Sequence, residues 1–237
     1  MKCFFSENFK YLSGQRKIKE EKLAESIGIS IKKIKDFLKN KDLPDAEQLV
    51  KISDFLNFPL NRLLTEDVSA TEHIIKTFDF KFLVMDIDGV MTDGGIIYTE
   101  SGDEIKKFNA RDGLAIISLV NAGFHVGFLS SGFKENTIKH RAEVLGVQKV
   151  YIGTWKKMEV LEQWCKELRI SLKNVAYIGD DLNDLPVIKK VGLSACPADA
   201  AEEVKEKVNV ILSLRGGKGC VREFADKYLS EFRKTPF

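Results

Sequence analysis

The sequence has no apolar run long enough to cross a membrane, since its longest apolar window, residues 113–129, is interrupted by Asn121, His125 and several glycines. A membrane-spanning helix needs about 20 mostly apolar residues. The opening stretch MKCFFSENFKYLSG lacks the continuous apolar segment of a signal peptide. Strong net charge is also missing, because 37 basic residues are balanced by 35 acidic ones. These absences favour a cytoplasmic protein that no bulk electrostatic field draws to a membrane or to nucleic acid.

Cysteine is scarce, and its four copies are widely scattered with no C-x-x-C pair. This spacing favours reduced, incidental thiols over a disulfide framework or a zinc site. The chain also contains no internal repeat, low-complexity tract or Gly/Ser linker. With 237 residues, 44% of them hydrophobic and 30% charged, it has the composition of a globular protein with one large or two smaller domains.

The hydrophobic pattern predicts two domains of different class. Residues 1–67 carry apolar side chains at helical spacing and form an all-helical domain. Residues 68–80 are the junction, in which Ile74 and Ile75 indicate a short packed helix. From residue 81 to 237, strand and helix signals alternate, which predicts an α/β fold with a Rossmann-like parallel sheet flanked by helices. A β-hairpin inserts after the first strand, where residues 95–99 and 104–108 flank the turn sequence Glu-Ser-Gly-Asp.

The helical domain resembles the small helix-turn-helix domains of the phage-repressor class. Gly28 lies where the turn between two short helices requires a left-handed residue, and Ser30 suits the N-cap of the next helix. In such a domain the helix over 31–38 enters the major groove of DNA, so candidate contacts are Lys32, Lys33 and Lys35.

Two features of this domain argue against strong DNA binding. Its first 70 residues contain 13 basic and 11 acidic side chains, a weak field for neutralising phosphates. Glu20 also stands where these domains often have glutamine at the start of the second helix. We therefore expect a helical appendage used for packing or assembly, with DNA binding as the alternative.

The most informative stretch is residues 82–93. An apolar run, residues 82–85, predicts a buried parallel strand that leads directly into Asp86, Asp88 and Gly89. Ligands of open α/β sheets bind beyond the carboxyl ends of the strands. Two carboxylates one residue apart repel each other unless a cation lies beside them, and Mg²⁺ prefers such oxygens. The alternative is an acidic corner without chemistry.

Three further predicted strands end in polar side chains. Ser131 follows the strand over 125–129, Lys157 lies at a helix start after the strand over 149–152, and Asp180 and Asp184 follow the strand over 175–178. Acids, a hydroxyl and an amine at one sheet edge are what phosphoryl transfer requires, although each feature alone has a simple structural explanation.

These motifs, in this chain order, resemble those of the haloacid dehalogenase-like phosphohydrolases. Within them the chain is similar to the cap-less branch that includes 3-deoxy-D-manno-octulosonate 8-phosphate phosphatase. The features that carry this second resemblance are the hairpin, residues 108–113 (FNARDG), residues 177–182 (YIGDDL) and residues 215–223 (RGGKGCVRE).

The resemblance implies a role for each motif residue. Asp86 is the nucleophile, which forms an aspartyl-phosphate, and Asp88 is the general acid and base. Mg²⁺ is bound by Asp86, by the backbone carbonyl of Asp88 and by Asp180. The remaining roles are phosphate binding by Ser131 and Lys157, support by Asp181 and Asp184, and substrate contact by Asn109, Arg111, Asp112, Gly113, Arg141 and Lys218.

Two departures from the family pattern leave the substrate open. Phe133 and Ile117 stand where octulosonate enzymes often carry basic residues, and Lys134 replaces them only in part. Because Arg binds carboxylates bidentately, a nine-carbon ketoacid phosphate of the sialic-acid type is an alternative to the eight-carbon one. A second alternative is a DNA-binding regulator whose phosphatase-like domain senses a sugar phosphate.

The resemblance also implies a homotetramer. Without a cap domain the site would be open to water, and in this branch neighbouring subunits cover it. The hairpins form a central barrel, and the Gly-rich segment around Gly216, Gly217 and Gly219 reaches a neighbour.

Overall fold

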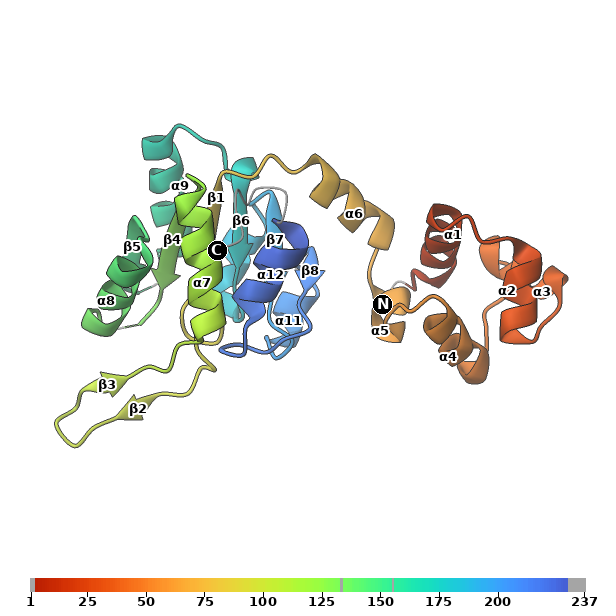
Figure 1. Ribbon diagram of the computed structural model, residues 1–237, viewed down its shortest axis with the longest axis horizontal. Helices are drawn as coiled ribbons and strands as arrows, with labels where there is room; N and C mark the ends of the chain where they lie inside the picture. Colours follow the sequence, from red (N-terminus) through yellow and green to blue (C-terminus); the bar gives the residue numbers. More distant parts are fainter. Residues whose placement is uncertain (1–2, 133, 155, 230–237) are drawn as a thin grey trace. The chain divides into compact units, whose positions relative to one another are not determined.

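The computed structural model describes residues 3–132, 134–154 and 156–229. The chain divides into two units, Met1–Lys76 and Thr77–Phe237 (Figure 1). The residues predicted as a junction contain helix α6 (Val68–Thr77) and the loop that leads into the first strand. Among the described residues, no helix combines the length and apolar character that a membrane crossing needs.

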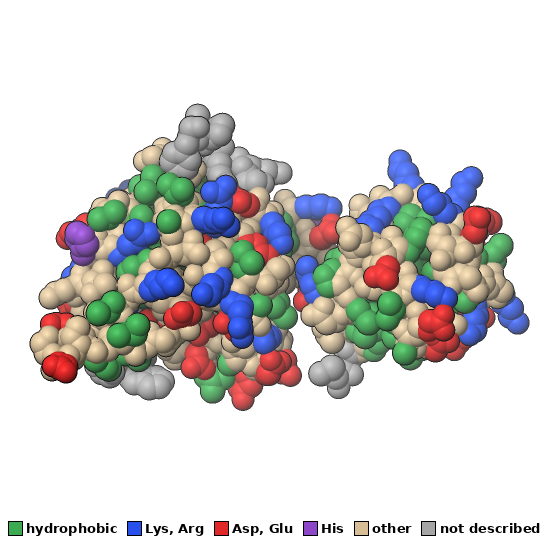
Figure 2. Space-filling view, turned by 60° about the horizontal axis from the view of Figure 1, so that its bottom comes forward, with side chains coloured by type: hydrophobic (Ala, Val, Ile, Leu, Met, Phe, Trp, Pro, Cys, Tyr) green, Lys and Arg blue, Asp and Glu red, His purple; other side chains and the backbone are tan. Residues whose placement is uncertain are grey.

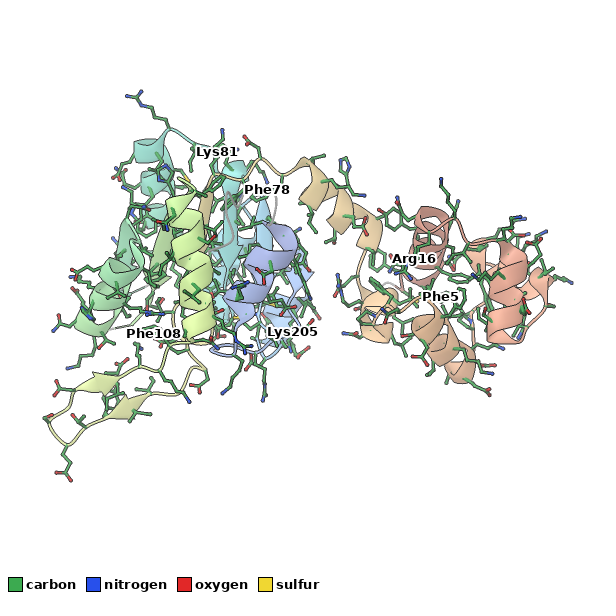
Figure 3. The ribbon with its side chains drawn as sticks, viewed as in Figure 1. Phe5, Arg16, Phe78, Lys81, Phe108 and Lys205 are labelled. Carbon is green, nitrogen blue, oxygen red and sulfur yellow. The ribbon has the colours of Figure 1, made fainter. Side chains whose placement is uncertain are left out.

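The first unit is helical, with a core built on aromatic side chains. Phe5 and Phe9 stack with ring centroids 5.4 Å apart, and Phe37 meets Phe5 edge-on at 6.1 Å. Phe5 points inward among the helices in Figure 3. Besides α6, the unit contains α1 (Phe5–Gln15), α2 (Glu20–Ile27), α3 (Ile31–Leu38), α4 (Ala46–Phe55) and α5 (Leu60–Thr65).

The turn between α2 and α3 has the predicted chemistry. Gly28 adopts a left-handed conformation, with φ of 78°, which a residue without a β-carbon accepts at no steric cost. The hydroxyl of Ser30 accepts a hydrogen bond of 3.3 Å from the backbone N–H of Lys33 and so caps α3. Together, α2 and α3 form the helix-turn-helix.

The second unit is built on a six-stranded sheet with the order β5-β4-β1-β6-β7-β8, in which every neighbouring pair is parallel. This architecture confirms the predicted Rossmann-like fold class. The strands are β1 (Phe82–Met85), β4 (His125–Ser130), β5 (Lys149–Ile152), β6 (Val175–Ile178), β7 (Leu193–Cys196) and β8 (Val210–Ile211).

Helices cover both faces of the sheet, so β1 is buried along its whole length. Phe82 and Val84 pack on the side of α9 and α10, in one cluster with Trp164 and Val187. Because side chains alternate along a strand, Leu83 and Met85 face the side where α7 and α12 lie next to each other. The helices are α7 (Ala110–Asn121), α8 (Asn136–Leu145), α9 (Lys157–Leu168), α10 (Leu185–Ile188), α11 (Glu202–Lys205) and α12 (Cys220–Tyr228), with short 3₁₀ turns at Leu172–Asn174 and Leu182–Asp184.

The predicted hairpin consists of two short antiparallel strands, β2 (Ile97–Tyr98) and β3 (Glu104–Ile105). In Figure 1 it projects away from the sheet, between the loop that follows β1 and the start of α7. Its apolar side chains are more than half or about half exposed, at 58% for Ile96, 57% for Ile97, 60% for Tyr98 and 50% for Ile105. The hairpin therefore presents an uncovered apolar surface.

The strand order places a topological switch point beside β1, the position where ligands bind in this class of fold. The chain leaves β1 toward β4 and β5 on one side, then crosses to β6 on the other side of β1. Connections that diverge in this way open the carboxyl edge between β1 and its neighbours. The acids that follow β1 and β6 lie at this edge.

Candidate active site

Asp86 lies at the centre of the carboxyl edge. Its backbone N–H donates to the carbonyl of Ile178, which extends the ladder between β1 and β6 by one residue. The residue is 5% exposed, and its Oδ1 accepts a 2.6 Å hydrogen bond from the N–H of Ile87. Burial raises the pKa of Asp86 to about 7, the charge of Asp184 adds to the rise, and Lys157 opposes it.

Lys157 is the first residue of α9, and its ammonium group joins two acids. It donates hydrogen bonds of 2.6 Å to Oδ2 of Asp86 and to Oδ1 of Asp184, and it is 3% exposed. Burial lowers the pKa of Lys157, but the two carboxylates raise it above its ordinary value. The ammonium therefore stays charged and balances one of the negative charges of the site.

Asp184 receives four donors, so both of its carboxylate oxygens are occupied. Oδ1 accepts from Lys157 and from the hydroxyl of Tyr177, each at 2.6 Å. Oδ2 accepts from the backbone N–H groups of Asp180 and Asp181, at 2.9 and 3.3 Å. Asp184 thus fixes both the lysine and the turn that carries Asp180.

Tyr177 also belongs to this hydrogen-bond network, which was not predicted from the sequence. Its ring is fully buried in β6, and its hydroxyl donates to Asp184. The sequence does contain an indication of this contact, because a tyrosine in a buried strand needs a hydrogen-bond partner for its hydroxyl group. Asp184 is the acid that the following turn brings back toward the strand.

Asp180 has a buried carboxylate oxygen, Oδ1, that no described group hydrogen-bonds. Burial raises the pKa of Asp180 to about 8, with further contributions from the charges of Asp86 and Asp184. Gly89, in a left-handed conformation with φ of 84°, lies against this carboxylate, and a β-carbon at this position would overlap with it. Three acids and one ammonium leave an excess of negative charge, which a cation would neutralise.

The donor set fits a hard divalent cation. Asp86, Asp180 and Asp184 each offer a carboxylate oxygen, and these atoms lie within 4.8 Å of one another. Asp184 already accepts four hydrogen bonds, so Asp86 and the unpaired oxygen of Asp180 are the side-chain ligands that remain.

Asp88 has hydrogen-bond partners outside that acid group. Its Oδ1 accepts a 2.6 Å hydrogen bond from Lys106, which lies on the hairpin arm, and a 3.3 Å bond from the hydroxyl of Thr92. Neither contact was predicted from the sequence. For Lys106 the reason is that the alternation along the hairpin does not show which of its side chains reach the loop after β1. The side chain of Asp88 is 30% exposed, so it remains accessible from solvent.

Ser131 follows β4 and meets the turn after β6. Its hydroxyl oxygen accepts a 3.0 Å hydrogen bond from the side-chain amide of Asn183. The other amide atom, Oδ1 of Asn183, is buried and has no partner in the described residues. Asn183 is thus a further polar residue at this edge that sequence reasoning missed. Phe133, on which the substrate alternatives depend, lies outside the described residues.

Two of the predicted substrate residues have structural contacts in this structure. Asn109 caps α7 by accepting from the N–H of Arg111, and its amide donates to the carbonyl of Gly217 at 3.2 Å. Asp112 is fully buried, and its Oδ1 accepts a 2.7 Å bond from the N–H of Arg222 at the start of α12. Burial raises the pKa of Asp112 to about 6. Both residues join α7 to the chain that leads into α12.

Arg141 is held between α8 and α7. Its guanidinium lies over the ring of Phe108 at 5.4 Å, and a β-carbon at Gly113 would overlap with it. Figure 3 shows Phe108 where the hairpin returns to α7. Nε of Arg141 is buried without a partner in the described residues, so this side chain has unused donor capacity.

The remaining predicted residues lie at the surface. The side chains of Arg111 and Lys218 are exposed and available to a ligand. Asp181 is exposed as well, and its Oδ1 accepts a 2.7 Å bond from the N–H of Leu182, so in this structure it shapes the local turn.

The Gly-rich segment packs on its own chain. A β-carbon at Gly216 would overlap with the carbonyl of Gly89, and the N–H of Gly217 donates to the carbonyl of Val90 at 2.9 Å. The absence of side chains at these glycines therefore allows the segment to lie against the β1 loop of the same subunit.

The chain is similar to known proteins in both of its units. The haloacid dehalogenase-like hydrolase family matches residues 145–219, and the helix-turn-helix domain family matches residues 7–67. Over 160 residues the chain is 36% identical to 3-deoxy-D-manno-octulosonate 8-phosphate phosphatase KdsC of Escherichia coli (strain K12), covering 68% of this chain and 85% of that protein.

Solved structures agree with this similarity. The 3-deoxy-D-manno-octulosonate 8-phosphate phosphatase of Yersinia pestis is 36% identical, with a TM-score of 0.64 over 66% of this chain and 84% of that one. The phosphatase of the same name from Moraxella catarrhalis, in complex with magnesium ion, phosphate ion and a KDO molecule, is 30% identical, with a TM-score of 0.65 over 69% of this chain and 92% of that one.

Proposed function

Since the chain belongs to the haloacid dehalogenase-like phosphatases, in the family of the 3-deoxy-D-manno-octulosonate 8-phosphate phosphatases, we propose that it is a Mg²⁺-dependent enzyme that hydrolyses 3-deoxy-D-manno-octulosonate 8-phosphate. The observation that carries the proposal is the buried group of Asp86, Lys157, Asp184 and Asp180 at the carboxyl edge of β1 and β6.

In the first proposed step, a carboxylate oxygen of Asp86 attacks phosphorus and the bond from phosphorus to the sugar oxygen breaks. Asp88 gives its proton to the departing oxygen, so the sugar acid leaves as an alcohol and Asp86 carries the phosphoryl group. In the second step, a water molecule attacks the same phosphorus, Asp88 accepts the proton of the water, and phosphate is released from Asp86.

The other residues position and neutralise the phosphoryl group. Lys157 is placed by Asp184, which is fixed in turn by Tyr177, so its ammonium is prearranged beside the nucleophile. Ser131 supplies a hydroxyl donor, because its oxygen already accepts from Asn183. Asp86, the carbonyl of Asp88 and Asp180 would bind Mg²⁺, which when present neutralises charge on the phosphoryl oxygens.

Substrate contact is assigned to cationic groups around this edge. Arg111 and Lys218 are exposed, Arg141 has an unpaired donor, and the exposed Lys134 is near Ser131 in sequence. Such groups would bind the carboxylate and hydroxyls of a ketoacid. A nine-carbon, sialic-acid-type phosphate is the alternative substrate, since the departures at Ile117 and Phe133 remove two basic residues of the family pattern.

An assay of phosphate release from eight- and nine-carbon ketoacid phosphates, with Mg²⁺ and with EDTA, tests the proposal. We expect the eight-carbon ester to have the highest kcat/KM, and chelation to abolish turnover. A preference for the nine-carbon ester would support the alternative substrate. Absence of turnover on both esters would contradict the enzyme assignment and favour the sugar-phosphate sensor.

We further propose a homotetramer in which the hairpins pack together. The support is the row of exposed apolar residues, Ile96, Ile97, Tyr98 and Ile105, on an arm that projects from the sheet. Exposed apolar patches of this kind mark interaction sites on folded proteins.

For the helical unit we propose packing or assembly rather than DNA binding. Lys35, one of the three candidate DNA contacts, lies 3.4 Å from Glu20 in an ion pair, which removes part of the positive charge of α3. Figure 2 shows acidic side chains among the basic ones on the visible face of this unit. A gel-shift titration at physiological salt against random and promoter DNA tests this, and retardation at micromolar protein would contradict it.

A further inference from the structure

Lys106, on the arm that returns from the hairpin, points inward. Along this arm the exposure alternates, because Ile105 is 50% exposed, the side chain of Lys106 is 4% exposed, and Lys107 is again exposed. A lysine side chain is almost never buried to this degree unless its charge is paired. This burial indicates that the charge of Lys106 is paired.

The ammonium of Lys106 lies between two carboxylates. It donates to Oδ1 of Asp88 at 2.6 Å and also contacts the carboxylate of Glu104, whose side chain is 9% exposed. The two carboxylates pair the positive charge of the buried ammonium. Glu104 keeps the lysine in place from the hairpin side.

The two oxygens of Asp88 have different surroundings. Oδ1 accepts from Lys106 and, at 3.3 Å, from the hydroxyl of Thr92. Oδ2 faces Gly132, since a β-carbon at that glycine would lie 3.7 Å from it. Gly132 directly follows Ser131, the proposed phosphate ligand. One oxygen is therefore fixed from the hairpin side, and the other faces the phosphate-binding turn.

We propose that Lys106 is a positioning residue for proton transfer by Asp88. The inference rests on the proposed function of Asp88 as general acid and base. When the bond from phosphorus to the sugar oxygen breaks, the proton on Oδ2 of Asp88 passes to that oxygen and Asp88 becomes a carboxylate. Lys106 stabilises this carboxylate through Oδ1 and keeps Oδ2 directed at the leaving group, so proton donation meets a lower barrier.

A residue that acts through the general acid differs from one that only anchors the hairpin. Departure of a sugar alkoxide requires a proton, whereas p-nitrophenolate is a weak base and leaves without one. Loss of Lys106 should therefore slow the first step for a sugar phosphate much more than for p-nitrophenyl phosphate. A general loss of structure would slow both substrates alike.

The test compares kcat/KM for the two esters in the full-length enzyme with Mg²⁺, because kcat/KM reports the steps up to bond cleavage. For Lys106→Met we expect a loss of about 10²-fold on the sugar acid phosphate and less than about 10-fold on p-nitrophenyl phosphate, within the range that general acid catalysis contributes. Lys107→Met, which changes the exposed neighbour, is the matched control and should retain both activities.

A second variant and a binding measurement make the result decisive. Lys106→Arg keeps the charge but changes its geometry, so it should show the same selective loss to a smaller extent, and it replaces Lys106→Met if that variant does not fold. Calorimetric Mg²⁺ affinity should be unchanged in both. Equal losses on the two esters, or no loss, in a folded variant would overturn the role of Lys106. Absence of wild-type activity on both esters would instead contradict the proposed function itself.

Discussion

Gly89 and the carboxylate of Asp180 lie so close together that the site has no room for a β-carbon between them. Gly89 follows β1 and Asp180 follows β6, so this contact joins the two loops at the carboxyl edge. The missing β-carbon leaves room for Asp180 beside Asp86, where its unpaired oxygen is available to a cation. The glycine of the first acidic motif thus allows the close approach of Asp180 in the last one.

Gly89→Ala should therefore displace Asp180 and lower Mg²⁺ affinity. Mutation of a residue that supports a metal ligand typically lowers metal affinity or activity by about 10- to 100-fold. The new side chain also occupies a left-handed conformation, which costs about 1–2 kcal/mol of stability. Isothermal titration with Mg²⁺ and steady-state turnover measure the first effect, and thermal unfolding measures the second.

Gly123→Ala is the matched control, because Gly123 has a similar φ of 87° but nothing within 4 Å of an added β-carbon. It should show the same loss of stability with normal Mg²⁺ affinity and turnover. Normal Mg²⁺ affinity in Gly89→Ala as well would show that the Asp180 position does not depend on this glycine.

Lys157→Met should inactivate the enzyme and destabilise it. Removal of the ammonium leaves Asp86 and Asp184 buried without their shared partner, and breaking a buried pair costs about 3–5 kcal/mol. Turnover should fall by about 10²–10³-fold, as for loss of one charge-stabilising donor. Lys156→Met, at the exposed neighbouring lysine, should change stability by less than about 0.5 kcal/mol and keep full turnover. Similar kinetics in the two variants would contradict the role of Lys157.

Stability without metal should fall as pH rises. The pKa values of Asp86 and Asp180 are raised from 3.8 to about 7 and about 8, so the folded state binds these protons more tightly than the unfolded state. Their contribution is complete below the unfolded value and is lost as pH rises through the folded values. In EDTA we therefore expect Tm to decrease between pH 5.5 and 8.5, and to decrease less in Asp180→Asn.

Mg²⁺ should reverse this loss, and more so at the higher pH, because protons compete with the cation for the carboxylates. At a concentration of 100 Kd it would add about 2.7 kcal/mol. Tm in EDTA and in Mg²⁺ at both pH values provides the comparison. A larger Mg²⁺ effect at pH 5.5 than at pH 8.5 would contradict the assignment of these acids to the cation.

Ile97→Lys should weaken the proposed tetramer. Ile97 pairs with Ile105 across the hairpin and is 57% exposed, so a charge there would be buried on assembly without a partner. Multi-angle light scattering should show a shift to smaller species. Val144→Lys, at an equally exposed position on α8, is the control. A wild-type protein that is a fully active monomer would exclude the tetramer.

The fold class could be predicted because the buried strands and the helix signals alternate along the sequence. Once the sheet is parallel, the acids after β1 and β6 must share one edge, and the structure places Asp86, Lys157 and Asp184 within hydrogen-bond distance there. Local patterns and chain order were sufficient for this part.

Contacts between distant segments could not be predicted in the same way. Lys106 lies 18 residues from Asp88, and nothing in the hairpin pattern shows that it turns inward to that side chain. Asp112 and Arg222 are 110 residues apart, so the hydrogen bond from the N–H of Arg222 to Asp112 depends on how α7 and α12 pack. These roles follow from tertiary packing, which periodicity does not encode.

The most direct measurement is phosphate release from 3-deoxy-D-manno-octulosonate 8-phosphate, with Mg²⁺, by the wild type, Asp86→Asn and Asp88→Asn. The wild type should turn over, and each variant should lose activity by at least about 10²-fold while keeping its circular dichroism spectrum, because in the proposed mechanism one carboxylate attacks phosphorus and the other transfers the proton. Unchanged phosphate release in either folded variant would contradict this mechanism.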